Sequence, residues 1–198
     1  MKPSTFQLTA TAILSALTLL LGLTPLGIIP LGFINVTILA IPVIIGTLSL
    51  GLKSGLALGL SFGLASLFRA FTSPSGLVAP LLQNVPVFVV LMCLIPRLLI
   101  PVSASVVYRA SQRNQIARRI ALPMAAIAGS LTNTALYLGL MLAFYMAAGL
   151  NAEAILTLIS TTAAIAGGCE ALVAAILTTP IVSAVSKITL FSGGQEGR

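Results

Sequence analysis

One stretch constrains this chain more than any other, because it combines the apolar character of a membrane crossing with a charge. From Val89 to Pro101 the sequence is apolar except for Arg97, which follows a proline. The stretch lies within a helix predicted from about Pro86 to Ala110, which is longer than the roughly 20 residues that a crossing needs. A cation buried in lipid is costly unless a partner or a cavity accommodates it. The remaining sequence must therefore supply something for Arg97 to face.

Few acidic residues are available to neutralise Arg97. The chain has three, Glu153, Glu170 and Glu196, and only Glu170 lies within another apolar run. Arg97 and Glu170 could form a structural ion pair, or Arg97 could extend its side chain to the membrane surface. The two charges could instead belong to a site for an anion or a polar solute, because charges inside membrane segments usually mark functional sites.

Charged residues are scarce along the whole chain, and this defines its class. Of the 198 residues only 7% are charged and 58% are hydrophobic, whereas soluble domains carry roughly 25% charged residues. We therefore predict an all-α membrane protein, with residues 1–198 forming one membrane-embedded domain. The net charge of +7 comes from basic residues scattered at helix ends, so we expect no nucleic-acid partner. The chain has no histidine, and we expect no metal site and no cofactor.

Six apolar segments separated by breaks predict six transmembrane helices. We expect these helices at about 6–23, 35–50, 55–69, 86–110, 120–149 and 154–185. Pro42 predicts a kink in the second helix. The four arginines between residues 109 and 119 mark a cytoplasmic loop. Alternating from that loop places both termini in the cytoplasm and leaves Arg69 as a lone basic residue on the outer side.

Small and helix-breaking residues predict two further local features. The segment 25–35 is largely apolar but contains two prolines and two glycines, so we expect an irregular, lid-like or cavity-lining segment. Glycines recur every fourth residue at Gly55, Gly59 and Gly63, which predicts a close-packed helix face. Two alanines with the same spacing on the first helix, Ala12 and Ala16, are a weaker signal of the same kind.

Polar side chains from several segments converge at one depth. By residue counting, Arg97, Asn133 and Glu170 each lie near the middle of a predicted helix, and Tyr137 shares a helical face with Asn133. From the outer side the segment Phe33–Asn35 and the amides Gln83 and Asn84 approach the same region, although Asn84 could equally cap the following helix. The candidate site therefore comprises Phe33, Asn35, Gln83, Asn84, Arg97, Asn133, Tyr137 and Glu170. Alternatively, these groups only hydrogen-bond one another as structural contacts.

The chemistry of these side chains suggests a class of solute. The planar fork of an arginine matches a carboxylate, so a solute bearing a carboxylate would satisfy Arg97. Asn133, Tyr137 and Glu170 could then bond hydroxyl or amide groups. Because Glu170 would repel an anion beside it, this residue should bond a donor at the far end of the solute or hold Arg97 in orientation.

Several stretches form an ordered set along the chain. They are Ile29–Thr37, Ile41–Gly46, Gly51–Gly55 and Phe62–Leu67, and Ile95–Arg97 and Glu170–Ala171 fit the same set. Together they resemble the substrate-binding S component of energy-coupling-factor vitamin transporters, and they look most like its pantothenate-type members. Leu52 departs from the proline expected in many relatives, which affects a turn rather than the site.

The resemblance implies a function and a set of partners. It implies a multi-pass subunit of the cell membrane that binds a vitamin from outside with high affinity, with pantothenate as the first candidate. It also implies a transmembrane coupling subunit, on which the face of Ala12 and Ala16 docks, and two cytoplasmic ATPase subunits.

Other functions are weighed against this one. The chain has no Gly-x-x-x-x-Gly-Lys phosphate loop, so we expect that it is not itself an ATPase. An enzyme of another kind is disfavoured because a single acid within the membrane leaves no acid–base pair. Binding of another vitamin, or a structural role without a solute site, remain the alternatives.

Overall fold

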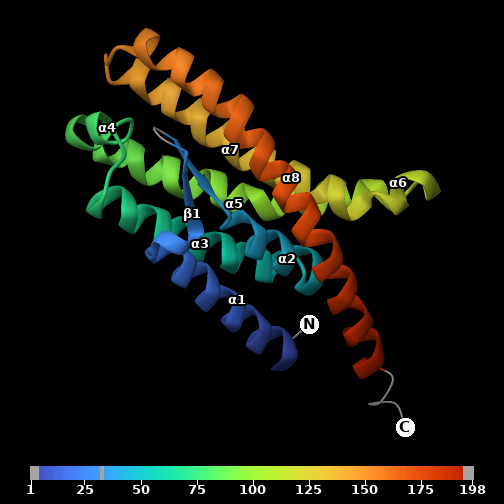
Figure 1. Cartoon of the computed structure of the whole chain (residues 1–198). Coiled ribbons are helices and arrows are strands. Elements are labelled where there is room, and N and C mark those ends of the chain that lie inside the picture. The colour runs from blue at the N-terminus through green and yellow to red at the C-terminus, as the bar shows by residue number, and fades with distance from the viewer. Residues whose placement is uncertain (1–4, 32–33, 194–198) are drawn as a thin grey trace.

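The computed structural model describes residues 5–31 and 34–193, and most of them are helical (Figure 1). Within these residues five helices are long and apolar enough to cross a membrane. They are α1 (Thr5–Leu23), α3 (Leu52–Thr72), α5 (Pro86–Ser111), α7 (Ala121–Ala147) and α8 (Ala152–Gly193). The shorter elements are the 3₁₀ turn η1 (Pro25–Gly27), α2 (Ala40–Leu50), α4 (Ala79–Asn84) and α6 (Gln115–Arg119). A helical membrane protein is thus confirmed, whereas six crossings remain a prediction because α2 has only 11 residues.

The prediction for the segment before α2 is wrong. In place of an irregular segment and the start of a helix, β1 (Ile28–Leu31) and β2 (Ile34–Thr37) pair as an antiparallel hairpin, with Ile28 opposite Thr37. The segment is rich in β-branched residues, which favour extended backbone. Pairing also satisfies backbone groups that an irregular segment would leave open in apolar surroundings. The chain therefore reaches α2 through a regular hairpin.

The prolines act differently in the two helices that contain them. Pro42 does not kink α2, because this helix begins at Ala40 and a proline in the first turn loses no helical hydrogen bond. Pro96 and Pro101 lie inside α5, and each withholds an N–H from the carbonyl group four residues earlier. The carbonyl left by Pro101 is that of Arg97.

The glycines of α3 bring this helix against α5. A Cβ atom at Gly59 would lie 2.6 Å from the carbonyl oxygen of Arg97, and one at Gly63 would lie 2.9 Å from the side chain of Leu94. A Cβ atom at Gly55 would meet both Thr47 of α2 and Pro101 of α5. The predicted close-packed face is confirmed, and its main partner is the helix that carries Arg97.

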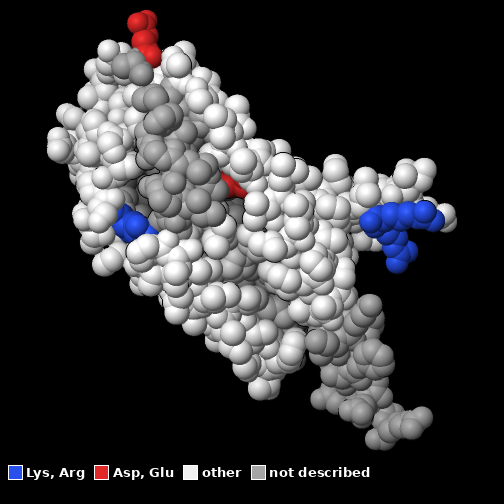
Figure 2. Space-filling view, in the orientation of Figure 1, with Lys and Arg blue, Asp and Glu red and all other residues white. Residues whose placement is uncertain are grey.

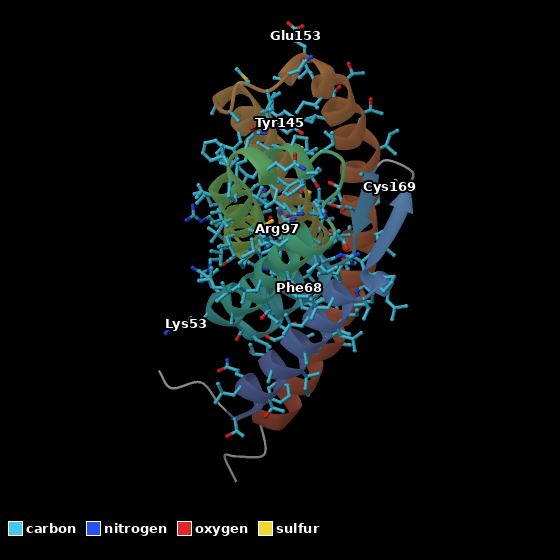
Figure 3. All side chains as sticks on the ribbon, turned by 90° about the vertical axis from the view of Figure 1, so that its left-hand side faces the viewer. Lys53, Phe68, Arg97, Tyr145, Glu153 and Cys169 are labelled. Atoms are coloured by element: carbon cyan, nitrogen blue, oxygen red, sulfur yellow. The ribbon has the colours of Figure 1, made fainter. Side chains whose placement is uncertain are left out.

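The N-terminal end of α1 and the C-terminal end of α8 lie on the same side of the molecule (Figure 1). Glu153 lies at one end of the molecule, Lys53 lies at the side toward the other end, and Arg97 lies between them in depth (Figure 3). On the face shown in Figure 2, basic residues gather around the end occupied by α6 and most of the remaining surface is uncharged. These positions agree with the middle depth predicted for Arg97. The cytoplasmic location of both termini remains a prediction.

Candidate functional site

A cavity of about 220 Å³ is lined by side chains of α3, α5, α7 and α8 and by Thr37 at the end of β2. Its charged and amide-bearing lining residues are Arg69, Arg97, Asn133 and Glu170, and Thr134, Tyr137, Ser66, Ser73 and Ser75 add hydroxyl groups. Leu77, Val78, Leu138 and Met141 contribute apolar wall. A few convergent polar groups within apolar walls are typical of sites for small molecules.

Arg97 is held firmly on the wall of this cavity. It is 7% exposed, and its Nη1 donates a hydrogen bond of 3.1 Å to the carbonyl oxygen of Met92. The guanidinium carbon lies 5.1 Å from the ring centre of Phe62 on α3 and 4.5 Å from that of Tyr137 on α7. Aromatic faces attract a cation at such distances. The buried Nε has no hydrogen-bond partner, and Arg97 as a residue lines the cavity.

Glu170 binds the hairpin and α7. Its Oε1 accepts a hydrogen bond of 2.8 Å from the backbone N–H of Thr37, and its Oε2 accepts one of 3.1 Å from the hydroxyl of Thr134. The carboxylate therefore joins β2, α7 and α8 at one point. Among the described residues no carboxylate lies within ion-pair distance of Arg97. The alternative of a structural Arg97–Glu170 ion pair is not the arrangement found here.

This junction leads to a prediction about the hairpin. In a Glu170→Ala variant the amide of Thr37 loses its acceptor, and we expect its hydrogen exchange to accelerate by roughly 10-fold or more, because a hydrogen bond to a charged group contributes about 1.5–3 kcal/mol. Exchange at this amide would be followed by mass spectrometry of the peptide that contains β2. Glu153→Ala is the matched control, since Glu153 is an exposed acid at the start of the same helix. Equal exchange in both variants would contradict the role given to Glu170.

Asn133 and Tyr137 lie on the same cavity wall, as their spacing on α7 predicts. Asn133 is 5% exposed, and its Oδ1 has no hydrogen-bond partner. A buried oxygen without a donor costs about 1–3 kcal/mol, so the protein leaves the polar groups of Asn133 incompletely satisfied. The structure thus brings together Arg97, Asn133 and Glu170, which the sequence placed at one depth. Tyr137, predicted on the same helical face as Asn133, joins them.

Gln83 and Asn84 are not brought to this cavity. Both are exposed at the end of α4, and neither lines the cavity. The Asn84 side chain donates a hydrogen bond of 2.8 Å to the carbonyl of Pro80 within α4, and α5 begins without a side-chain cap. The amide therefore fulfils neither of the two roles considered for it, because its own helix occupies it.

The segment Phe33–Asn35 is placed only in part. Asn35 lies in β2, where its backbone is paired with that of Pro30, whereas Phe33 lies outside the described residues. The hairpin reaches the cavity two residues later, at Thr37.

Sequence reasoning missed Arg69 and the serines near it. Ser66, Arg69 and Ser73 are three and four residues apart, which places them on one face of α3 and its end. Arg69 donates hydrogen bonds of 3.4 and 3.2 Å to the carbonyls of Gly22 and Thr24, which lack helical partners at the end of α1. The spacing of Ser66, Arg69 and Ser73 is the sequence signal that could have placed Arg69 at the site.

The charged residues of the lining are two arginines and one glutamate, so the lining carries one net positive charge.

The two alanines of α1 lie away from the cavity. Ala12 and Ala16 are both exposed, and α1 packs on α2 and α3 with Thr18 and Gly22 buried. The outward face of α1 is therefore open to lipid or to a partner helix.

Comparison with known proteins adds the family. A profile of the family described as "ECF transporter, substrate-specific component" matches residues 6–186. This chain belongs to that family. The S component is also 32% identical, over 160 residues, to the pantothenic acid transporter PanT of Lactococcus lactis subsp. cremoris (strain MG1363), an alignment that covers 76% of this chain and 78% of the relative. The family and this relative are transporters, and the S component is accordingly a membrane transport protein.

Proposed function

We propose that this S component binds pantothenate with high affinity at the outer side of the cell membrane, as the substrate-binding subunit of an ATP-driven importer. The observation that carries the proposal is Arg97, a buried arginine that lines a cavity sized for a small molecule and has no carboxylate of the described residues within ion-pair distance. An arginine fork and a carboxylate form strong, charge-assisted hydrogen bonds. Pantothenate has one carboxylate, and the relative PanT is named for pantothenic acid.

The remaining lining suggests how the vitamin would be oriented. With its carboxylate at Arg97, the hydroxyl and amide groups of pantothenate would lie near Asn133 and Glu170, which line the same cavity. Glu170 would repel an anion, so the hydroxyl end should face it. The net positive lining favours an anion over a neutral solute.

The partners of this importer follow from the family. We infer a transmembrane coupling subunit and two cytoplasmic ATPase subunits, because the chain has no phosphate loop of its own. The exposed face of Ala12 and Ala16 suits a closely packed partner helix. Six crossings with both termini in the cytoplasm are part of this proposal.

Two other functions are less well supported. Another vitamin would bind in the same cavity but would have to offer Arg97 a different hydrogen-bond acceptor. A purely structural role leaves unexplained why the buried Arg97 lines a cavity without a carboxylate of the described residues within ion-pair distance.

A panel of vitamins tests the proposal. We expect pantothenate to raise the melting temperature of the purified protein, since a ligand at 100 times its Kd stabilises the folded state by about 2.7 kcal/mol. Biotin, riboflavin, thiamine and the alcohol analogue pantothenol, which lacks the carboxylate, are the controls and should have much smaller effects. Stabilisation by a different vitamin alone would replace pantothenate with that vitamin, and stabilisation by none would favour the structural role.

A further inference from the structure

Pro96 creates a vacant hydrogen-bond acceptor beside Arg97. It is fully buried inside α5. Because proline has no N–H, the carbonyl group four residues earlier loses its helical donor. In α5 that carbonyl belongs to Met92, whose side chain is also fully buried. An unpaired carbonyl in such surroundings is unfavourable, so another donor is needed.

The donor that fills the vacancy is Arg97. Its Nη1 lies 3.1 Å from the Met92 oxygen, and the bond runs back along the same helix. The guanidinium is then fixed by this hydrogen bond and by the rings of Phe62 and Tyr137. Three contacts, from α3, α5 and α7, therefore define its orientation.

We propose that Pro96 is a positioning residue for the carboxylate of the substrate, acting through Arg97. By leaving the Met92 carbonyl without a helical donor, it provides the acceptor that orients the guanidinium at the cavity wall. An N–H at position 96 would close the helical bond to Met92 and compete with Nη1. The Arg97 side chain would then have more rotamers to lose when a ligand binds, and the affinity would fall. This inference rests on the proposed binding of pantothenate.

The same helix contains a matched control. Pro101 is also buried inside α5, but the carbonyl it leaves without a helical donor is that of Arg97 itself. That oxygen faces Gly59 of α3 and not the guanidinium group. A substitution there changes the helix in the same way without supplying a competitor for the Met92 carbonyl.

The test measures two ligands in four variants. In Pro96→Ala we expect roughly 10-fold weaker binding of pantothenate, the scale of one hydrogen bond, with binding of the neutral pantothenol unchanged. Pro101→Ala should bind both ligands as the wild type does. In an Arg97→Ala background, addition of Pro96→Ala should cause no further loss, because a positioning residue acts only through the group that it positions. Unchanged pantothenate binding in Pro96→Ala, or an equal loss for both ligands, would overturn the proposal.

A second measurement needs no ligand. Arg97→Ala should lower the melting temperature less in the Pro96→Ala background than in the wild type. In that background the N–H of the introduced alanine satisfies the Met92 carbonyl after the guanidinium is removed. Strict additivity of the two substitutions would overturn the link between Pro96 and Arg97. If the wild type fails to bind pantothenate while this coupling is found, the proposed substrate is wrong but the positioning of Arg97 stands.

Discussion

Replacement of Arg97 by alanine is expected to weaken pantothenate binding by at least about 30-fold, which corresponds to about 2 kcal/mol or more for truncation of a buried, charged hydrogen-bond partner. The variant loses the guanidinium fork that the proposed binding mode places against the carboxylate. Arg97→Lys keeps the charge but not the paired donors, so its affinity should lie between those of the wild type and the alanine variant. Isothermal titration of the purified proteins with pantothenate would measure both losses.

Two controls separate a contact with the substrate from a general effect of removing an arginine. Arg109 is an exposed arginine near the end of the same helix, and Arg109→Ala should bind pantothenate normally. Pantothenol has no carboxylate, so its weaker binding should be much less sensitive to Arg97→Ala. Normal pantothenate affinity in Arg97→Ala would show that the guanidinium is structural and that the carboxylate binds elsewhere.

The central residues of this site were predictable because charge is rare in membrane segments. Arg97 and Glu170 stand out in apolar sequence, and counting residues along the helices placed them at one depth with Asn133. Their hydrogen bonds were not predictable in this way. The partner of Arg97 is a carbonyl of its own helix, and the first partner of Glu170 is a backbone N–H of a hairpin 133 residues away.

The hairpin itself shows why the rest of the fold was harder to predict. Its prolines and glycines suggested an irregular segment, while the β-branched residues Ile28, Ile29 and Ile34 carried the opposite signal. Two short strands are marginal on their own, so their formation depends on contacts such as that between Thr37 and Glu170. Such contacts become visible only when the helices have been placed.

The positions of Gln83, Asn84 and Arg69 relative to the cavity were also hard to predict, because they depend on where the neighbouring helices end. Gln83 and Asn84 immediately precede an apolar helix, which suggested the mouth of a site or a cap. The short helix α4 ends at Asn84 and turns this amide back toward Pro80. Arg69, by contrast, was assigned only to topology, although its spacing from Ser66 and Ser73 places it on the cavity side of α3.

Gly59→Ala is expected to have the second large effect, on both stability and binding. The added Cβ atom would lie 2.6 Å from the carbonyl oxygen of Arg97, a distance that cannot be relieved by rotating a side chain. Helices α3 and α5 would have to separate, and overpacking of this kind costs about 1–3 kcal/mol. Because Arg97 stacks on Phe62 of the same α3, the separation should also displace the guanidinium and weaken pantothenate binding.

The matched control for this substitution is Gly139→Ala on α7. A Cβ atom there would meet nothing within 4 Å, so this variant should keep wild-type binding and gain up to about 1 kcal/mol from the better helix propensity of alanine. The melting temperatures of the two variants should therefore shift in opposite directions, whereas pantothenate titrations should show weaker binding only in Gly59→Ala. If Gly59→Ala were as stable as Gly139→Ala, α3 could not be pressed against the Arg97 carbonyl. The guanidinium would then owe its position to Met92 and Tyr137 and not to the glycine face.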